Sequence, residues 1–396
     1  MLLGVAICTL VAMSLAAAVL DSQTLKPQEA QQMAHATGKM RTICVGRFLV
    51  DMPESAEINL TQPRIGGFEI STFNETEAEF QKRVIERESQ IRKTPDWRGG
   101  DANLESTREV KTSSGLVGKI FIHSRTVVEG TQGNGLGKVE RYRHEGISTE
   151  ALVHGHGISI DLFYENRALE LVDDLPTLVN QLVANPDNRI PSEPGFCIDR
   201  AYVRDPLSAD QGEQIMMFAR LPKHPDVKFT FISAAGLKPD TRGVLARNDA
   251  VNASLPWAER MRVSRLRGAG REIDGIQDEE LVELVVEDND AHVHSFWWEV
   301  NGTEDNLFVP HVVLQMNTGN GNRVPVPSSL SNRVALGLWD KILSNLRLRT
   351  KPAALNKATA STTLLAMPAS TDERCLTSKK RSCNDVATST ISAPPT

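Results

Sequence analysis

The sequence lacks the short motifs that carry common hydrolase and metalloenzyme chemistry. No Gly-x-Ser-x-Gly pentapeptide occurs, which excludes a nucleophile elbow, and neither His-Glu-x-x-His nor Cys-x-x-Cys is present. These absences argue against a zinc-binding helix and a paired-cysteine metal site. No pair of carboxylates stands out for hydrolysis. We therefore expect no catalytic residues, no cofactor and no metal site, and a protein that is not an enzyme.

An excess of positive charge is also missing. The 396 residues carry a net charge of −6 at pH 7, which provides no electrostatic surface for nucleic acid or for an anionic membrane. Hydrophobic residues make up 40% and charged residues 24%, values typical of a soluble globular protein. The length allows two domains or one large domain. We expect a protein partner recognised by shape and mixed polarity, with no nucleic acid and no small-molecule substrate.

A glycine-rich stretch at 130–138 resembles a phosphate-binding loop only superficially. Gln132 stands where the first glycine of a Walker loop belongs. The stretch also joins two strand-like runs, without a helix whose N-terminus would hold a phosphate. A hairpin loop is the better interpretation.

Two histidine pairs are candidates for metal binding. His154 and His156 flank a glycine, and His292 and His294 alternate along a strand-like run, so each pair could face one side. No third ligand is fixed by the sequence, and we interpret both pairs as polar residues on the solvent face of a sheet. The acidic stretch 287–290 lacks the glycine and the distal glutamate of a calcium loop, which indicates a tight turn.

The first twenty residues are apolar and carry no charge. Small residues at 16–18 offer a cleavage site, so a secretory signal fits best. No Lys or Arg precedes the apolar run, so either the start is misplaced or the segment is retained as an anchor, because about twenty apolar residues can span a bilayer. Cys8 lacks the small residue that should precede a lipidated cysteine. We expect a periplasmic protein, either free or attached to the inner membrane.

Four cysteines remain after removal of the signal. Cys44, Cys197, Cys375 and Cys383 permit disulfides in an exported chain, but the sequence does not give their pairing. Free buried thiols at Cys44 and Cys197 are an equal alternative. The segment 351–396 is rich in Ala, Ser, Thr and Pro and has no apolar period, which predicts a disordered tail.

A weak internal repeat runs through the remaining body of the chain. Residues 42–48 and 195–201 share a cysteine, a β-branched residue and an arginine at the same spacing. Residues 163–165 and 297–299 are each an aromatic pair followed by Glu. The closing helices match at an offset of 160 positions, at Leu178, Leu182, Val183, Asn185 and Arg189 against Leu338, Ile342, Leu343, Asn345 and Arg349. Three matches in the same order indicate a duplication.

Each half has strand patterns first and a helix last. In the first half a charged helix is predicted at 75–93, with a capping box from Thr76 and Glu79 and an apolar stripe. The stripe consists of Phe80, Val84 and Ile91. β-branched and aromatic runs predict strands at 43–50, 68–73, 115–128, 139–147, 151–153 and 158–164. A closing helix begins near Pro176.

The second half repeats this order. Strands are predicted at 214–219, 227–234, 281–287, 292–300 and 309–316. A final helix is capped by Ser328 or Ser329 and carries apolar residues at steps of four from Leu330 to Leu346. The sequence thus predicts an α+β fold with two similar domains, 40–190 and 195–350, each an antiparallel sheet covered by helices.

These residues resemble the two-domain immunity proteins that are cognate to type VI secretion lipase effectors (the fourth group of Tle cognate immunity proteins). The resemblance covers about 40–350. It rests on 44–53, 80–93, 194–199, 297–299, Pro310, 318–319 and 338–340.

The resemblance implies a periplasmic protein that binds a phospholipase effector and inhibits it, either by steric occlusion of its active site or by holding it in a closed state. It also implies that the two domains grip the effector between them. Two alternatives stay open: an envelope scaffold for another partner, and an enzyme with a dispersed active site.

The predicted loops 130–138 and 317–327 supply the candidates for contact with the partner. These are Gly130, Asn134, Lys138, Asn317, Asn320 and Arg323.

Overall fold

The computed structural model describes residues 26–349, apart from 134, 136, 137, 208–210, 305 and 321–323. The expected signal at 1–20 and the expected tail at 351–396, with Cys375 and Cys383, lie outside the described residues. Among the described helices, none is long and apolar enough to cross a membrane.

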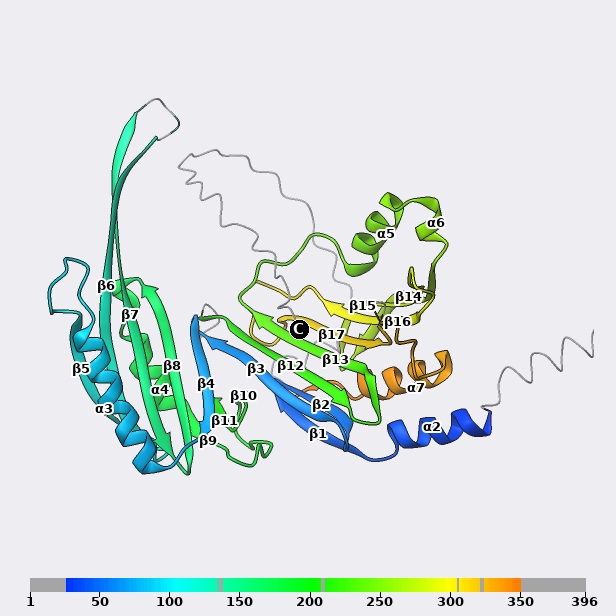
Figure 1. Ribbon diagram of the computed structural model, residues 1–396, viewed down its shortest axis with the longest axis horizontal. Helices are drawn as coiled ribbons and strands as arrows, with labels where there is room; N and C mark the ends of the chain where they lie inside the picture. The colour runs from blue at the N-terminus through cyan, green and yellow to red at the C-terminus, as the bar shows by residue number, and fades with distance from the viewer. Residues whose placement is uncertain are drawn as a thin grey trace, which may run out of the picture. The chain divides into compact units, whose positions relative to one another are not determined.

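The fold is α+β and is dominated by a twelve-stranded antiparallel sheet (Figure 1). Its order is β14-β15-β16-β17-β13-β12-β3-β4-β8-β7-β6-β5. The strands of the first half are β3 (Glu57–Ile65), β4 (Phe68–Asn74), β5 (Leu104–Lys111), β6 (Val117–Gly133), β7 (Val139–Gly155) and β8 (Ile158–Arg167). Those of the second half are β12 (Glu213–Leu221), β13 (His224–Ala235), β14 (Val263–Ile273), β15 (Ile276–Val286), β16 (His292–Val300) and β17 (His311–Thr318).

Both halves of the sheet have the same order of elements. From the centre outwards the first half runs β3-β4-β8-β7-β6-β5 and the second runs β12-β13-β17-β16-β15-β14. Because β8 corresponds to β17 in this order, the expected match of 163–165 on β8 with 297–299 on β16 is wrong. Helices follow β4 and β13, and a further helix closes each half. The helices are α3 (Glu77–Lys93), α4 (Asp174–Gln181), α5 (Val244–Ser254), α6 (Trp257–Arg260) and α7 (Asn332–Leu343).

The expectation of one sheet per domain is wrong. Strands β3 and β12 pair antiparallel, with Leu60 opposite Met217 and Glu57 opposite Arg220. This pairing satisfies the backbone groups that each half would otherwise leave open at its inner edge. The two halves therefore share one continuous sheet.

Two small sheets lie beside the large one, and they are built alike. One has the order β1-β2-β18 and the other β10-β11-β9. Their strands are β1 (Met40–Val45), β2 (Phe48–Pro53), β18 (Arg347–Leu348), β10 (Gly195–Ile198), β11 (Ala201–Arg204) and β9 (Leu182–Ala184). The strand predicted at 43–50 is therefore a hairpin, which turns at Gly46 with a φ of +55°.

The hydrogen bonds of these small sheets correct the alignment of the closing segments. The N–H of Asn185 donates to the carbonyl of Arg200 (2.6 Å), and the N–H of Arg349 donates to that of Arg47 (2.8 Å). Asn185 therefore corresponds to Arg349, so the expected matches of Asn185 with Asn345 and of Arg189 with Arg349 are wrong. The matches of Leu182 with Ile342 and of Val183 with Leu343 are wrong too, because the first residue of each pair lies in β9 and the second in α7. Residues 344–346 lie between α7 and β18, whereas β9 follows α4 directly.

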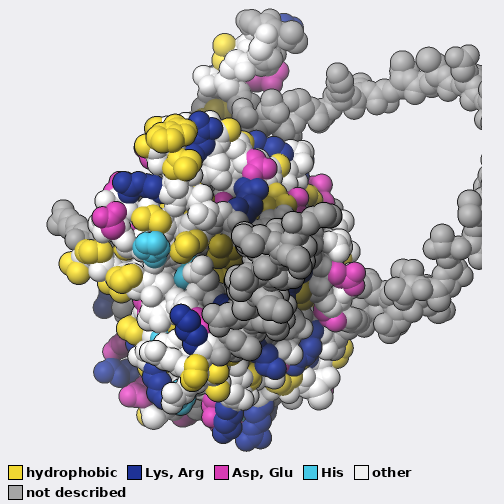
Figure 2. Space-filling view, turned by 90° about the vertical axis from the view of Figure 1, so that its right-hand side faces the viewer, with side chains coloured by type: hydrophobic (Ala, Val, Ile, Leu, Met, Phe, Trp, Pro, Cys, Tyr) yellow, Lys and Arg dark blue, Asp and Glu magenta, His cyan; other side chains and the backbone are white. Residues whose placement is uncertain are grey.

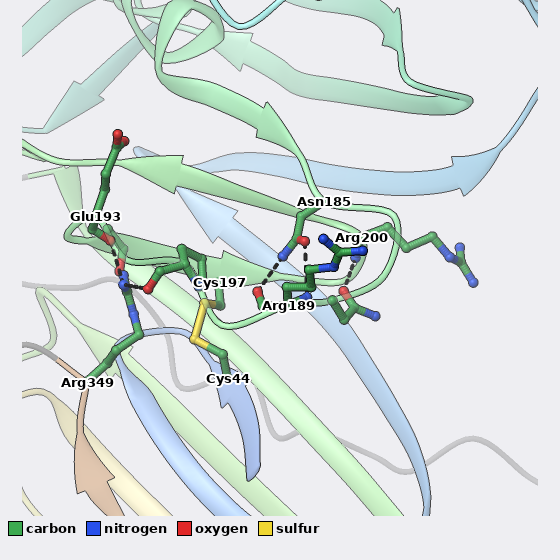
Figure 3. Close-up of a disulfide and its surroundings, with 10 residues drawn as sticks. Cys44, Asn185, Arg189, Glu193, Cys197, Arg200 and Arg349 are labelled. Carbon is green, nitrogen blue, oxygen red and sulfur yellow. Dashed lines mark hydrogen bonds between the residues drawn. A yellow bond between two sulfur atoms is a disulfide. The ribbon is translucent and has the colours of Figure 1, made fainter. Parts of the chain in front are cut away.

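A disulfide between Cys44 and Cys197 joins the two hairpins, with their Cα atoms 5.9 Å apart (Figure 3). The alternative of free thiols at these positions is therefore wrong. Gly46 and Cys197 also exchange two backbone hydrogen bonds of 2.9 Å. The bond spans 153 positions, and closing so long a loop stabilises a fold by about 3–5 kcal/mol.

The helix ends show which caps were predicted well. Thr76 and Glu79 form the expected capping box of α3, and Phe80, Val84 and Ile91 are buried. The final helix α7 begins at Asn332 and is capped by Ser331, whose hydroxyl accepts the N–H of Val334. The expected cap at Ser328 or Ser329 is therefore wrong. An additional helix, α2 (Pro27–Thr37), contacts α7.

Arg47 is buried at the junction of the two halves. Its guanidinium donates to Glu213 (2.6 and 2.8 Å) and to Asp205 (2.9 and 3.0 Å). Burial alone would lower the pKa of Arg47, but hydrogen bonds to Asp205 and Glu213 outweigh it and raise that pKa. Burial raises the pKa of Glu213 against the effect of Arg47. Bidentate contacts at these distances favour the charged pair at neutral pH.

Replacing Arg47 tests this junction. In Arg47→Met the carboxylates of Glu213 and Asp205 lose their cation, so we expect the free energy of unfolding to fall by about 3–5 kcal/mol. The control is Arg220→Met, which removes the exposed pair Arg220–Glu57 and should cost less than about 1 kcal/mol. Urea unfolding curves measure both. Equal losses in the two variants would contradict this role of Arg47.

Candidate functional site

One face of the large sheet is covered by helices only at its two ends. At one end α3 packs Phe80, Val84 and Ile91 against Phe121 and Leu152. At the other end α5 contacts β15. The strand registers place both helices on the same face. Over the central strands β3, β12, β13 and β17, this face carries no helix among the described residues.

We call this uncovered region the central open face. It is defined by Glu57, Asn59, Phe218, Arg220, Lys228, Thr230 and Asn317. Paired residues of neighbouring strands point to the same side, so these side chains form two rows across the four strands. A groove of about 580 Å³ lies along them.

The groove combines apolar and charged side chains. Phe218 is 40% exposed, whereas its neighbour Met217, on the other face of the strand, is fully buried. Arg220 forms an ion pair with Glu57 (2.5 Å). Lys228 is exposed and lines the same groove. Such a surface suits recognition of a protein partner, because interfaces mix aromatic anchors with a polar rim.

The structure brings one predicted contact residue into this groove and leaves others elsewhere. Asn317 lines the groove. Asn320 is tied by backbone hydrogen bonds to Val326 (2.7 and 2.9 Å), and Arg323 lies outside the described residues. The sequence missed Phe218 and Arg220, although their alternation with buried Met217 and Ala219 is the pattern of a strand with one open face.

The other predicted loop lies far along the sheet. Gly130 and Lys138 belong to the hairpin of β6 and β7, and Asn134 lies outside the described residues. Strand β6 is seven positions from β17 in the sheet, which corresponds to on the order of 30 Å. The hairpin interpretation of 130–138 is confirmed by the pairing of β6 with β7. The glycine at position 130 is explained by packing. A Cβ atom there would lie 2.5 Å from the hydroxyl of Tyr142, too close for a side chain.

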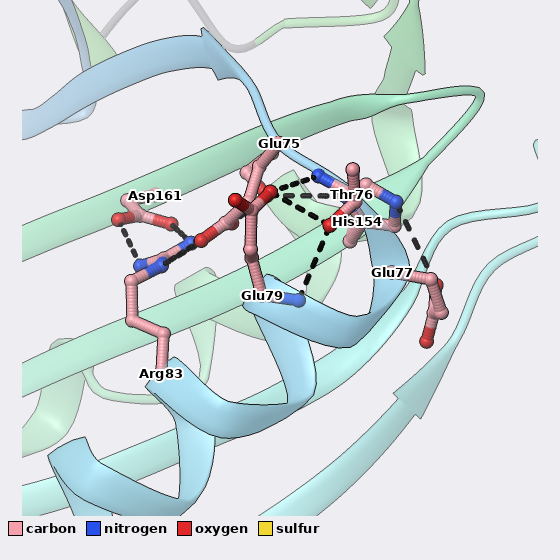
Figure 4. Close-up of polar contacts among 8 residues, drawn as sticks. Glu75, Thr76, Glu77, Glu79, Arg83, His154 and Asp161 are labelled. Atoms are coloured by element: carbon pink, nitrogen blue, oxygen red, sulfur yellow. Dashed lines mark hydrogen bonds and ion pairs between the residues drawn. The ribbon is translucent and has the colours of Figure 1, made fainter.

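A Ser-His-Glu arrangement near the start of α3 tests the enzyme alternative (Figure 4). Nδ1 of His154 lies 3.1 Å from Ser159 Oγ, and its Nε2 lies 3.6 Å from Glu77. Ser159 is fully buried, and its hydroxyl donates to Glu75. With its hydrogen committed to a carboxylate and no access for a substrate, Ser159 cannot act as a nucleophile. His154 instead stacks on Phe80.

Arg83 links α3 to the sheet through two carboxylates with opposite pKa behaviour. Its guanidinium contacts Glu75 (2.9 Å) and Asp161 (2.6 Å). Burial would raise the pKa of Glu75, but hydrogen bonds from Arg83 and Ser159 outweigh burial and lower it. Burial raises the pKa of Asp161 to about 6, with Arg83 opposing. These groups form a structural attachment of α3.

In the other histidine pair, His294 is buried in the packing and His292 is exposed. The expected place on the solvent face of a sheet is therefore wrong for His154 and His294. Nδ1 of His294 lies 2.7 Å from Thr318 Oγ1, and its Nε2 lies 2.8 Å from Asn332 Oδ1. Burial lowers the pKa of His294, so it is neutral at pH 7. Within the described part of the chain, no group of three or more His, Cys, Asp or Glu could hold a metal ion.

The Asp161 pKa predicts a pH-dependent stability. Because the folded value of about 6 exceeds the ordinary value, the folded state binds the extra proton between about pH 4 and pH 6. The stability of the wild type relative to Asp161→Asn should therefore fall as pH rises through this window, by up to about 3 kcal/mol. Denaturant unfolding at several pH values measures the difference. A difference that stays constant from pH 4 to pH 7 would contradict the burial effect.

Comparison with known proteins identifies the family. Residues 41–132 match the model of the Tle cognate immunity protein 4 N-terminal domain, and residues 189–351 match that of its C-terminal domain. Together they cover more than half of the chain. The chain belongs to the Tle cognate immunity protein 4 family. The resemblance noted in the sequence is thereby confirmed, and because this is a family of immunity proteins, the chain is not an enzyme.

Solved structures share the fold. The immunity protein TplEi of the type VI secretion system of Pseudomonas aeruginosa, in complex with the "L" peptide, is 23% identical with a TM-score of 0.61. The match covers 79% of this chain and 99% of that one. The crystal structure of the Tle4–Tli4 complex contains a chain that is 22% identical with a TM-score of 0.62, covering 79% and 98%. No curated protein sequence matches this chain.

Proposed function

We propose that this immunity protein binds and inhibits its cognate type VI secretion lipase effector. Membership of the Tle cognate immunity protein 4 family carries the proposal, because both domain models match in order. The likeness to the Tli4 fold solved in complex with Tle4 supports a protein effector as the partner.

Inhibition would occur by covering the active site of the effector and not by chemistry. A stoichiometric inhibitor must bind tightly, and a nanomolar dissociation constant corresponds to about −12 kcal/mol. Interfaces of that kind bury about 1,200–2,000 Å², more than one short loop supplies. We therefore propose that both halves of the protein contribute to the interface with the effector and that the central open face forms its centre. Gly130, Lys138, Asn317 and Asn320 stay contact candidates, as do Asn134 and Arg323 outside the described residues.

We further propose that the protein acts in the periplasm. The Cys44–Cys197 disulfide supports this, because disulfides persist in oxidising compartments. The apolar segment 1–20 would direct export and, if retained, would attach the chain to the inner membrane.

The finer domain description is also a proposal. Residues 40–190 and 195–350 would be two similar α+β domains, each carrying its own helices on its half of the sheet. The same order of strands from the centre outwards supports a duplication. The two small sheets of like construction support it as well.

Titration into the cognate effector tests the function. We expect lipase activity to be lost near a one-to-one ratio, with the mass of the effector unchanged. Full inhibition far below equimolar protein with a modified effector would favour an enzyme. No binding to the effector would favour an envelope scaffold.

A variant of the groove tests whether the central open face binds the effector. Phe218→Ala removes the exposed aromatic side chain and should weaken effector binding at least about 10-fold, because aromatic anchors dominate interface energies. The matched control is Leu171→Ala, which truncates a 44% exposed apolar side chain outside this face and should leave the Kd unchanged. Calorimetric titration of both variants gives the comparison.

A further inference from the structure

Helix α5 is attached to the sheet through polar contacts. The N–H of Leu245 donates to Glu279 (2.9 Å), and Asn248 donates to Glu283 (3.2 Å). Arg247 forms an ion pair with Glu299 (2.5 Å). Among the residues of α5, Val244 alone is buried. A surface helix ordinarily places an apolar side on the core, as α3 does, whereas the apolar residues of α5 do not form one side and the helix is held mainly by polar contacts.

Three apolar side chains at the end of α5 and in and just after α6 are exposed to solvent. Val251 at the end of α5 is 59% exposed, and Trp257 and Met261, one helical turn apart, are 70% and 67% exposed. We call these three residues the α5–α6 apolar surface. Figure 2 shows exposed hydrophobic side chains among charged ones on the side of the molecule that carries α5 and α6. Large apolar side chains exposed this far on consecutive helices are candidates for an interaction site.

The charges near this surface favour a protein over a membrane. Glu259 and Arg260 follow Trp257 in the sequence and carry opposite charges. Arg265 is paired with Asp249 (2.6 Å) and Arg262 with Asp288 (3.1 Å). A helix that binds an anionic bilayer needs a surplus of cations, whereas protein interfaces are enriched in Trp, Met and Arg. The chain as a whole carries a net charge of −6.

Helix α5 lies at the end of the central open face. One row of paired residues runs from Phe218 through Thr230 and Gln315 to Trp297 and Leu281. Residues Glu279 and Glu283 on the same side of β15 hold α5. A protein that lies on the central open face therefore meets α5 at the end of that row.

We propose that the α5–α6 apolar surface is a docking site for an apolar patch of the effector, with Trp257 as its main anchor. This inference rests on the proposed function and assigns part of the effector-binding surface to residues outside the groove. Trp257→Ala should weaken effector binding at least about 30-fold, the loss typical of a hot-spot tryptophan. Because Trp257 is exposed, the Tm of the free variant should not change.

The experiment compares wild type, Trp257→Ala and the control Ile190→Ala, which truncates a 45% exposed side chain near the small sheets. Calorimetry with the cognate effector gives each Kd. Oxidative labelling of Trp257, followed by mass spectrometry, should show a reactive side chain in the free protein and protection in the complex. Ile190→Ala should bind as the wild type does.

Each other outcome counts against the inference. Wild-type binding with an unchanged Kd for Trp257→Ala and no protection would overturn it and leave the proposed function standing. Absence of any wild-type binding would overturn both. Protection of Trp257 in the free monomer would mean that the chain covers its own surface. A Trp257-dependent dimer in light scattering, or Trp257-dependent sedimentation with phosphatidylglycerol vesicles, would assign the surface to another occupant.

Discussion

The guanidinium of Arg47 lies between Glu213 and Asp205 at the point where the two halves of the sheet meet. Arg47 belongs to the turn between β1 and β2, whereas Glu213 is the first residue of β12, the strand that pairs with β3. The same turn is tied to the other half by the Cys44–Cys197 disulfide. A covalent bond and a buried charge network thus hold the one strand pair that makes the sheet continuous.

This junction has a direct consequence for binding. The central open face is formed by β3, β12, β13 and β17, so it exists only while the two halves are joined in register. A binding surface that is already rigid in the free protein needs little ordering when a partner binds. The entropic cost of ordering therefore subtracts less from the binding free energy. The helices at both ends of this face are attached by ion pairs, Arg83–Asp161 at α3 and Arg247–Glu299 at α5.

The sequence predicted elements whose burial follows a simple period. Helix α3 was predicted from its capping box and its apolar stripe, and the strands β4, β8 and β16 from alternation and β-branched residues. The outer strand β5 was missed because only Leu104 and Val110 are even partly buried, so no alternation marks it. Helix α5 was missed for a related reason, since its apolar residues do not gather on one side: Val244 is buried, whereas Val251 is 59% exposed.

The site was harder to predict than the fold. Cys44 and Cys197 were recognised as equivalent positions, but their pairing depends on hairpins that meet across 153 positions of sequence. Asn317 was selected from a loop pattern and lies at the groove, whereas Gly130 is explained by the packing of Tyr142. Phe218 and Arg220 become candidates only when the face that they share is known to be uncovered.

Hydrogen–deuterium exchange of the whole chain, with and without the cognate effector, tests the central claim most directly. We predict that amide exchange in β3, β12, β13 and the segment 244–261 is slower in the complex. The reason is that the effector covers the central open face and the α5–α6 apolar surface. Protection confined to α4, α7 and the two small sheets, on the opposite face, would contradict the account.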